Sequence, residues 1–235
     1  MKIHKNDDLF KLLKSVDTPT VCNAIELAEG KRGFNGFSKS MFQVADVSLP
    51  PMVGYAKTAR IKASEPSQEP AELVKEKRMN YYKYMSECDT PSICVIEDVD
   101  YPHCVGAFWG EVNNHIHKGF GLGGTLTNGL MRDMDFLAPN YQVLASSVGV
   151  SHAFVHVLDF DEPVQIFGID IEPYDFIHAD RHGAVVIPKH LLPVLGKSIT
   201  KLIDMEKIVL EPAKQEDFDF EKFKTSWEAF EKARV

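Results

Sequence analysis

The chain has 235 residues, 44% of them hydrophobic, and a formal net charge of −8 at pH 7. A chain of this length and apolar content can bury a full core. Its acidic balance, with no cluster of lysines and arginines, argues against a nucleic-acid partner, because a phosphate backbone binds cationic patches. No run of about eighteen apolar residues is present that would span a bilayer, and the polar start lacks the apolar core of a signal peptide. We therefore expect a cytoplasmic protein that binds neither nucleic acid nor membrane.

The first half of the chain alternates between helical and strand patterns. Asp17 is a helix-capping residue followed by proline, and Gly30 ends the helix that begins there. In the strand that follows, Lys57 and Arg60 are expected to face outward or toward a site. The predicted elements are a helix over 19–29, a strand over 52–61, a helix over 71–87 and a buried strand over 92–96.

The second half continues the alternation and ends in helices. Its predicted elements are a helix over 109–118, a strand over 125–128, short apolar runs at 141–145, 153–158 and 163–168, a strand–turn–strand unit over 171–188, a helix over 189–209, a linker over 212–219 and a last helix over 220–233. Phe223, Trp227 and Phe230 lie on one face of the last helix, which indicates packing. We expect a layered α/β domain over residues 1–210 and a helical extension over 211–235.

Four glycines between residues 119 and 124 imitate a dinucleotide-binding loop. Such a loop must follow a strand and open a helix, whereas these glycines follow a predicted helix and precede a predicted strand. The order of elements therefore excludes a Rossmann site. The four cysteines show no C-x2-C spacing, so neither a disulfide framework nor a zinc site is expected.

Arg132 and Asp133 stand side by side outside any helical pattern. Arginine offers a planar cationic fork for a carboxylate, and aspartate offers a hard oxygen ligand for a divalent ion. The pair therefore suits an anionic substrate held on a metal, although an exposed ion pair would have the same sequence. The histidines lack a spacing that requires a transition metal; His115 and His117, for example, point apart on a helix. An oxygen site for Mg²⁺ or Mn²⁺ is the favoured metal hypothesis.

Glu111 precedes Arg132 by 21 positions, so the chain contains an acid, twenty residues, and then Arg-Asp. This resembles the D/E-x20-R-D signature of the RraA-like family, which includes the class II 4-hydroxy-4-methyl-2-oxoglutarate and 4-carboxy-4-hydroxy-2-oxoadipate aldolases. The strand that starts at Met52 is similar to the family's V-G-x-A-x-T strand. The segment from Ile171 to Pro188 is also similar to the family, with Tyr174 in place of a usual glycine.

The resemblance covers about residues 17–209 and implies a fold and an activity. The implied fold is a swivelling β/α domain of the phosphohistidine-domain-like type, assembled as a homotrimer or as a homohexamer built from two trimers. The implied activity is a divalent-metal-dependent lyase that cleaves a 4-hydroxy-2-oxo acid to pyruvate and a second carbonyl compound, with oxaloacetate decarboxylation as a related reaction. Two alternatives stay open. One is a metal-free regulator of ribonuclease activity, against which Asp133 argues because that branch lacks the ligand; the other is a family enzyme acting on a different oxo acid or a sugar acid.

The resemblance also implies roles for individual residues. Asp133 is the expected ligand of Mg²⁺ or Mn²⁺, and Arg132 is expected to pair with the substrate's carboxylate and developing enolate. Glu111 is expected to hold water in the proton network. Glu206 of an adjacent subunit is expected to help deprotonate the C4 hydroxyl, with Glu211 as the second choice. The substrate carboxylate is expected to meet the backbone N–H groups of Gly106, Ala107, Phe108 and Trp109.

Overall fold

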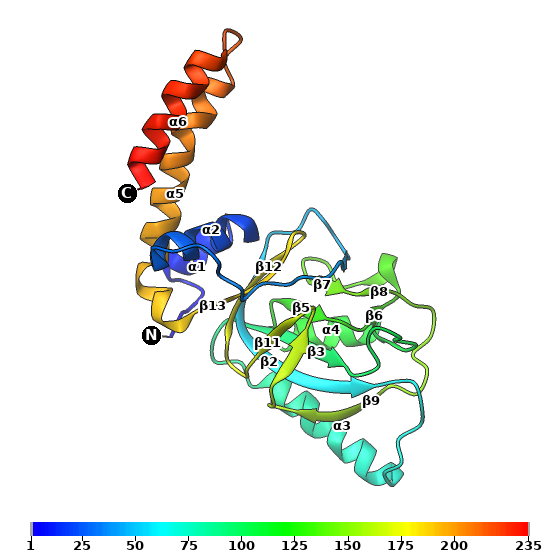
Figure 1. The fold of residues 1–235 in the computed structure, drawn as a ribbon. Helices are drawn as coiled ribbons and strands as arrows, with labels where there is room; N and C mark the ends of the chain where they lie inside the picture. Colours follow the sequence, from blue (N-terminus) through cyan, green and yellow to red (C-terminus); the bar gives the residue numbers. More distant parts are fainter. Residues whose placement is uncertain (1, 235) are drawn as a thin grey trace.

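The computed structural model describes residues 2–234, and its centre is one mixed β-sheet (Figure 1). The strand order is β1-β7-β5-β3-β2-β12-β13, with β9 paired to the later part of β2. Neighbours among β2, β3, β5 and β7 run parallel, whereas the pairings of β1, β9, β12 and β13 are antiparallel. The bounds are β1 Gln43–Val44, β2 Met52–Lys62, β3 Ser92–Asp98, β5 Gly124–Thr127, β7 Gln142–Ala145, β9 His156–Phe160, β12 Phe176–Asp180 and β13 Gly183–Ile187.

A smaller parallel sheet lies beyond the ends of the central strands. Its strands are β4 (Ala107–Trp109), β6 (Leu130–Met131) and β8 (Ser147–Val148), in that order. Each one follows a parallel strand of the main sheet along the chain, because β4 comes after β3, β6 after β5 and β8 after β7. The main sheet therefore delivers three chain segments to one place. A separate hairpin is formed by β10 (Val164–Ile166) and β11 (Ile169–Ile171).

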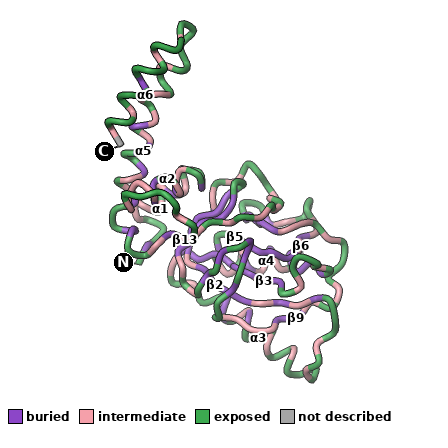
Figure 2. The backbone as a smooth tube through the Cα atoms, in the orientation of Figure 1, coloured by how far each residue is buried: buried purple, intermediate pink, exposed green. Residues whose placement is uncertain are grey.

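Helices cover the sheet in two groups, and most buried residues lie on the strands between them (Figure 2). The first group is α1 (Asp8–Leu13), α2 (Thr18–Glu29) and α5 (Leu192–Ala213), whose apolar faces share a core with β12 and β13. The second group is α3 (Ala71–Ser86), which packs on β9, and α4 (Glu111–Gly119). The mixed α/β fold predicted from the sequence is thus confirmed.

The last helix, α6 (Phe220–Arg234), folds back along α5, and together they project from the body of the molecule (Figure 1). The rings of Trp227 and Phe230 lie 5.4 Å apart, and those of Phe223 and Trp227 lie 5.7 Å apart, so the predicted aromatic face is present. Within residues 2–234, no helix has the length and apolar character needed to cross a membrane. The predicted C-terminal helical extension is confirmed as an element of the fold.

Local signals placed most of the elements correctly. The Asp17 side chain accepts a hydrogen bond of 2.9 Å from the backbone N–H of Thr20, and Gly30 ends α2 with a left-handed φ of 66°. Tyr174, which stands where the resembling family has glycine, adopts a φ of 65°. The backbone at this turn therefore keeps a conformation that favours glycine, despite the tyrosine side chain.

Three sequence expectations were wrong in detail. Trp109 belongs to β4 and pairs with Met131, so the helix predicted from residue 109 begins at Glu111. The predicted linker from residue 212 starts later, because α5 continues through Pro212 to Ala213 while α6 packs alongside. Lys57 does not face outward or toward a site. Its Nζ atom is buried, donates a 2.5 Å hydrogen bond to the carbonyl of Tyr84 and lies 4.1 Å from that ring's centroid.

Phe176, on β12, lies in the core between the sheet and the first group of helices. Its substitution tests how much this core stabilises the fold. Its side chain is 0% exposed, and its ring lies 4.8 Å from the ring of Tyr55. We predict that Phe176→Ala lowers the free energy of unfolding by about 3–5 kcal/mol, because a large cavity replaces the ring. Urea denaturation measures the change. Phe220→Ala, at a 70% exposed position, is the control and should cost less than about 1 kcal/mol.

Candidate active site

The smaller sheet ends at the Arg132–Asp133 corner. The backbone N–H of Arg132 donates a 2.7 Å hydrogen bond to the carbonyl of Trp109, which ties the corner to β4. Asp133 then takes a left-handed conformation with φ 55° and precedes a single 3₁₀ turn, η1 (Met134–Phe136). Aspartate tolerates this conformation better than most residues. The tight turn allows two neighbouring residues to present their side chains to one place.

Gly110 makes room for both side chains. The Oδ2 atom of Asp133 lies 3.8 Å from Nη1 of Arg132 and accepts a 3.2 Å hydrogen bond from the backbone N–H of Glu111, the first residue of α4. A Cβ atom at Gly110 would lie 2.4 Å from that Oδ2 atom and 3.1 Å from Nε of Arg132. A glycine is therefore required here by the close approach of the Arg-Asp pair. The carboxylate also lies at a helix N-terminus, which stabilises negative charge.

The Arg132 guanidinium has an unmet bonding requirement. Its Nε atom is buried and, within the part of the chain that the structure describes, has no hydrogen-bond partner. Leaving a buried donor unsatisfied costs about 1–3 kcal/mol, and more when the group is charged. About a third of the side chain is exposed, so an acceptor can reach the guanidinium from outside. Within the described residues, Arg132 therefore combines an ion pair with Asp133 through Nη1 and a buried Nε donor that has no acceptor.

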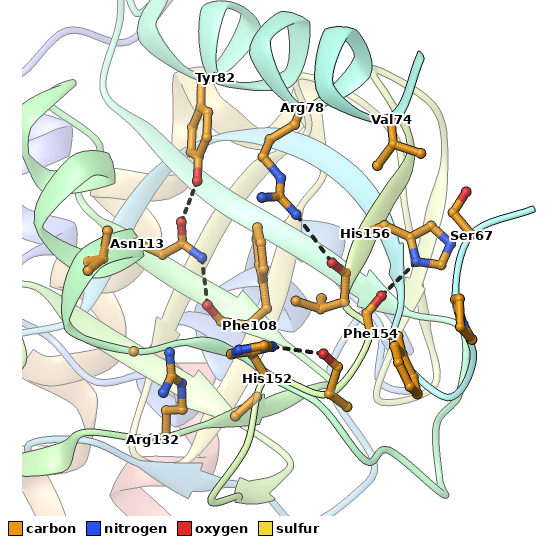
Figure 3. Close-up of a pocket in the computed structure, with 16 residues that line it drawn as sticks. Ser67, Val74, Arg78, Tyr82, Phe108, Asn113, Arg132, His152, Phe154 and His156 are labelled. Carbon is orange, nitrogen blue, oxygen red and sulfur yellow. Dashed lines mark hydrogen bonds between the residues drawn. The ribbon is translucent and has the colours of Figure 1, made fainter. Parts of the chain in front are cut away.

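Arg132 lines a cavity of about 500 Å³ (Figure 3). Walls come from α3, β4, the start of α4 and the loop that enters β9. Asp133 does not line the cavity itself. It lies against Gly110 and Arg132, and both of these residues line the cavity. Among residues 2–234, no Asp or Glu lines this cavity. The lining residues are Pro66, Ser67, Val74, Arg78, Tyr82, Ala107, Phe108, Gly110, Val112, Asn113, Arg132, His152, Ala153, Phe154, Val155 and His156.

The wall formed by β4 is held in place by hydrogen bonds to neighbouring segments. The amide nitrogen of Asn113 donates to the carbonyl of Phe108 at 2.6 Å, and the hydroxyl of Tyr82 donates to the amide oxygen of Asn113 at 2.6 Å (Figure 3). The backbone N–H of Ala107 donates to the carbonyl of Ser151 at 2.8 Å. Ala107 therefore lines the cavity, but its N–H is already bonded to another residue of the same chain. These bonds fix the segment that the family resemblance assigns to the substrate carboxylate, and they leave the N–H of Ala107 unavailable for it.

A buried histidine continues this network into the core. His117 is 0% exposed, its Nδ1 atom lies 2.6 Å from the carbonyl of Asn113, and its Nε2 atom lies 2.6 Å from the hydroxyl of Tyr81. A proton on Nδ1 bonded to the carbonyl leaves Nε2 as the acceptor for tyrosine. Burial lowers the pKa of His117 to about 4. The neutral ring therefore joins α4 to α3 beneath the cavity.

The remaining predicted site residues lie apart from this cavity within one chain. The side chain of Glu111 is exposed at the start of α4 and is not a wall residue. Glu206, on α5, lines a separate cavity of about 630 Å³ together with Trp227. Glu211 is exposed, and its carboxylate pairs with Lys214 at 3.1 Å. One chain thus brings Arg132 and Asp133 together with Ala107, Phe108 and Gly110. Of Glu111 only the backbone N–H reaches Asp133, Gly106 and Trp109 do not line the cavity, and Glu206 lines another one.

The donor set at the corner fits a hard cation that keeps much of its own water. Across residues 2–234, no group of three or more His, Cys, Asp and Glu side chains is placed to hold a metal. Asp133 offers one carboxylate, and about a third of its side chain is exposed. Mg²⁺ is often bound by one or two carboxylates plus ligand oxygens and waters, so this arrangement suits Mg²⁺ or Mn²⁺.

Sequence reasoning missed several wall residues, including Arg78, Tyr82, Asn113 and His152. Val74, Arg78 and Tyr82 are spaced by four, which places them on one helix face. That spacing was a usable signal, but the sequence analysis predicted only a helix over 71–87 from this segment. His152 and Asn113 carried no such signal, because their partners are backbone carbonyls fixed by the fold.

The chain is similar in sequence to a known protein family and to one described protein. The family model RraA-like, described as Aldolase/RraA, matches residues 18–186. Protein DlpA of Legionella pneumophila is 29% identical over 133 residues, which cover 55% of this chain; the match spans only about a fifth (21%) of DlpA.

Two solved structures share the fold at low sequence identity. The first is an uncharacterized protein from Pseudomonas syringae pv. tomato, with a TM-score of 0.66 and 20% identity, covering 100% of this chain and 95% of that one. The second is Streptomyces coelicolor RraAS2, described as an unusual member of the RNase ES inhibitor RraA protein family. It has a TM-score of 0.66 and 19% identity, covering 92% of this chain and 100% of that one.

His117 should make the stability of the protein depend on pH. Its folded pKa of about 4 lies below the ordinary value of 6.5, so its contribution is complete above pH 6.5 and is lost as the pH falls toward 4. The loss is on the order of 3 kcal/mol. We predict that His117→Gln lowers the free energy of unfolding at pH 7. The difference in this free energy between the variant and wild type should become smaller as the pH falls toward 4. Urea unfolding across this range measures it, with exposed His115→Gln as control; a constant difference contradicts the prediction.

Proposed function

The chain belongs to the RraA-like family, and we propose that it is a divalent-metal-dependent carbon–carbon lyase. The proposed reaction cleaves a 4-hydroxy-2-oxo acid to pyruvate and a second carbonyl compound, with oxaloacetate decarboxylation at the same site. The observation that carries the proposal is the corner around Gly110. There a guanidinium whose buried Nε atom has no acceptor among the described residues lies beside a carboxylate that could bind a hard cation.

Both reactions require the same stabilisation, because each breaks a bond to C3 of a 2-oxo acid and leaves the electron pair as the enolate of pyruvate. A bound Mg²⁺ or Mn²⁺ supplies Lewis-acid polarisation of the 2-oxo group. Arg132 binds the substrate carboxylate and the developing oxyanion through its planar fork, which a lysine cannot reproduce. Asp133 holds the cation and, through the N–H of Glu111, stays aligned with α4.

Aldol cleavage also requires a base for the C4 hydroxyl proton. Among the described residues, the cavity walls contain no carboxylate; their side chains that could accept a proton are Tyr82, His152 and His156. We assign the task to a water held by Glu111 at the open edge and by Glu206 of the partner subunit, as the family resemblance implies. Glu206 lies on α5 and lines the cavity that α2, α5 and α6 enclose, whereas Arg132 of the same chain lines a different one.

A homotrimer, or a hexamer of two trimers, is the assembly we propose. Several large apolar side chains are exposed beside the corner: Phe136 follows Asp133 in η1, Val112 lies in the first turn of α4, and Val150 follows β8. Phe136 is 65% and Val150 99% exposed. A cluster of exposed apolar residues indicates a protein interface, and here it would place a neighbouring subunit next to the site.

Pyruvate release from a panel of 4-hydroxy-2-oxo acids and oxaloacetate, with and without Mg²⁺, tests the proposed reaction. We expect pyruvate from at least one member and loss of turnover after chelation. Absence of pyruvate from every member would contradict the proposal and favour a regulatory role.

Two substitutions at the corner should differ in kind. Asp133→Ala should remove metal dependence together with nearly all activity, because the cation loses its protein ligand. Arg132→Lys keeps the charge but loses the fork, and kcat/KM should fall by a factor on the order of 10² or more, as for loss of an oxyanion donor.

The control is Arg60→Lys. Arg60 forms a two-point ion pair with Asp159 on the main sheet and does not line the cavity. The kcat/KM of the Arg60→Lys variant should therefore stay near that of wild type. If Arg132→Lys and Asp133→Ala both retain wild-type rates, the corner has no part in catalysis.

A further inference from the structure

The proposed lyase reaction involves two proton transfers, at two different atoms. When the bond between C3 and C4 breaks, the C4 hydroxyl loses a proton, and the proposed function gives this task to a water held by Glu111 and by Glu206 of the partner subunit. C3 keeps the electron pair of the broken bond as the pyruvate enolate, and it must gain a proton before pyruvate is formed. Oxaloacetate decarboxylation ends in the same enolate. Both reactions therefore require a group that gives a proton to C3.

The group that serves C3 must lie close to Arg132. C3 is bonded directly to the 2-oxo carbon, and the oxygens on that side of the substrate are assigned to Arg132 and the cation. Three side chains in the cavity walls can exchange a proton, namely Tyr82, His152 and His156. Figure 3 draws His152 at the end of the cavity where Arg132 lies, whereas His156 is drawn at the other end, near Ser67.

The three side chains also differ in how free they are to exchange a proton. The hydroxyl of Tyr82 already donates to the amide oxygen of Asn113 at 2.6 Å, and burial raises the pKa of Tyr82. His156 is only 7% exposed and belongs to β9. His152 is exposed, in the loop between β8 and β9. Of the three, His152 alone combines exposure with a place at the Arg132 end.

The loop that carries His152 is fixed against the segment that enters β4. The N–H of Ala107 donates to the carbonyl of Ser151 at 2.8 Å, and a Cβ atom at Gly106 would lie 2.7 Å from the carbonyl oxygen of His152. The next residue, Ala153, has a left-handed φ of 45°, and its N–H donates to Oγ of Ser151 at 3.0 Å. This conformation is strained for a residue other than glycine, so the surrounding contacts must hold it. The fold thus sets the position of His152.

The imidazole ring is oriented by a hydrogen bond of its own. Nδ1 of His152 lies 2.7 Å from the carbonyl of Ala153. Because a carbonyl only accepts, Nδ1 carries the proton of the neutral ring, and the lone pair on Nε2 stays free. The charged side chains that line the cavity with it are Arg78 and Arg132, and among the described residues no acid does. No carboxylate in the cavity walls therefore competes for Nε2.

We propose that His152 is the catalytic residue that exchanges a proton with C3 of the pyruvate enolate. The proposal rests on the proposed function, because it takes the enolate to be held by Arg132 and the cation. In the cleavage direction, the protonated ring gives its Nε2 proton to C3. The electron pair left by the broken C3–C4 bond, or by loss of carbon dioxide from oxaloacetate, forms the new C–H bond. The neutral ring then regains a proton from water, which also receives the proton of the C4 hydroxyl.

Hydrogen exchange into pyruvate isolates this step from bond cleavage. In D₂O with Mg²⁺, the neutral ring removes a proton from C3 of pyruvate and deuterium returns, so the methyl signal in the ¹H NMR spectrum decays. This exchange needs neither a C4 hydroxyl nor its base. We expect wild type to catalyse it, at a rate that rises between about pH 5 and 8, the range over which histidine loses its proton.

His152→Gln should separate proton transfer from binding. The exchange rate should fall by a factor on the order of 10² or more, as for loss of a general base, and its rise with pH should disappear. The Kd of pyruvate, measured by isothermal titration calorimetry with Mg²⁺ present, should stay within about twofold of wild type, because Arg132 and Asp133 are unchanged.

Two further histidine variants assign the effect to one ring. His156→Gln changes the other histidine of the cavity and should keep the rise with pH, because that ring is drawn at the end away from Arg132 (Figure 3). His190→Gln is the matched control for an exposed ring. The side chain of His190 is 69% exposed and does not line the cavity, so exchange should proceed as in wild type.

Several results would overturn the inference and leave the proposed lyase intact. These are exchange by His152→Gln at the wild-type rate or with the wild-type pH dependence, an equal loss in His156→Gln, and absence of exchange in a wild type that releases pyruvate from an oxo acid. A matching loss of pyruvate binding in His152→Gln would also overturn it, since the residue would then only shape the cavity. If wild type neither binds pyruvate nor releases it from any oxo acid, the proposed function fails first, and the inference fails with it.

Discussion

The site depends on one close approach, that of Gly110 to the carboxylate of Asp133. At this point the start of α4, the end of β4 and the turn after β6 meet within hydrogen-bond distance. Asp133 is held there in a left-handed conformation, which costs a non-glycine residue on the order of 1–3 kcal/mol. The surrounding bonds must outweigh that cost.

The topology explains why these segments meet at all. Three parallel strands of the central sheet each continue into one short strand of the smaller sheet, so residues far apart in sequence arrive side by side. In sheets with parallel strands, ligands bind beyond the strands' carboxyl ends. The smaller sheet occupies this position, and the Arg-Asp pair directly follows its middle strand, β6. The hydrogen bonds through Asn113 and His117 then make the wall rigid from the core side.

Much of this fold was predictable, because its signals are local. The Asp17 cap, the Gly30 stop and the apolar strand at Ser92 each act within a few residues. The Arg132–Asp133 corner was predictable through its spacing from Glu111, although the spacing could not show the contact with Gly110.

What the sequence missed depends on pairing between distant segments. Trp109 appeared helical because its pairing partner, Met131, is 22 residues away. Lys57 appeared exposed because the carbonyl that holds it belongs to Tyr84 at the end of a helix. Arg78 was overlooked for a related reason: a helix pattern shows which residues share a face, but not which cavity that face lines.

Anomalous diffraction from crystals soaked with Mn²⁺ and pyruvate would test the central claim most directly. The account predicts a manganese peak bound by the carboxylate of Asp133, directly or through water, with the pyruvate carboxylate against the guanidinium of Arg132. A manganese peak elsewhere with none at Asp133, or pyruvate bound away from Arg132, would contradict it.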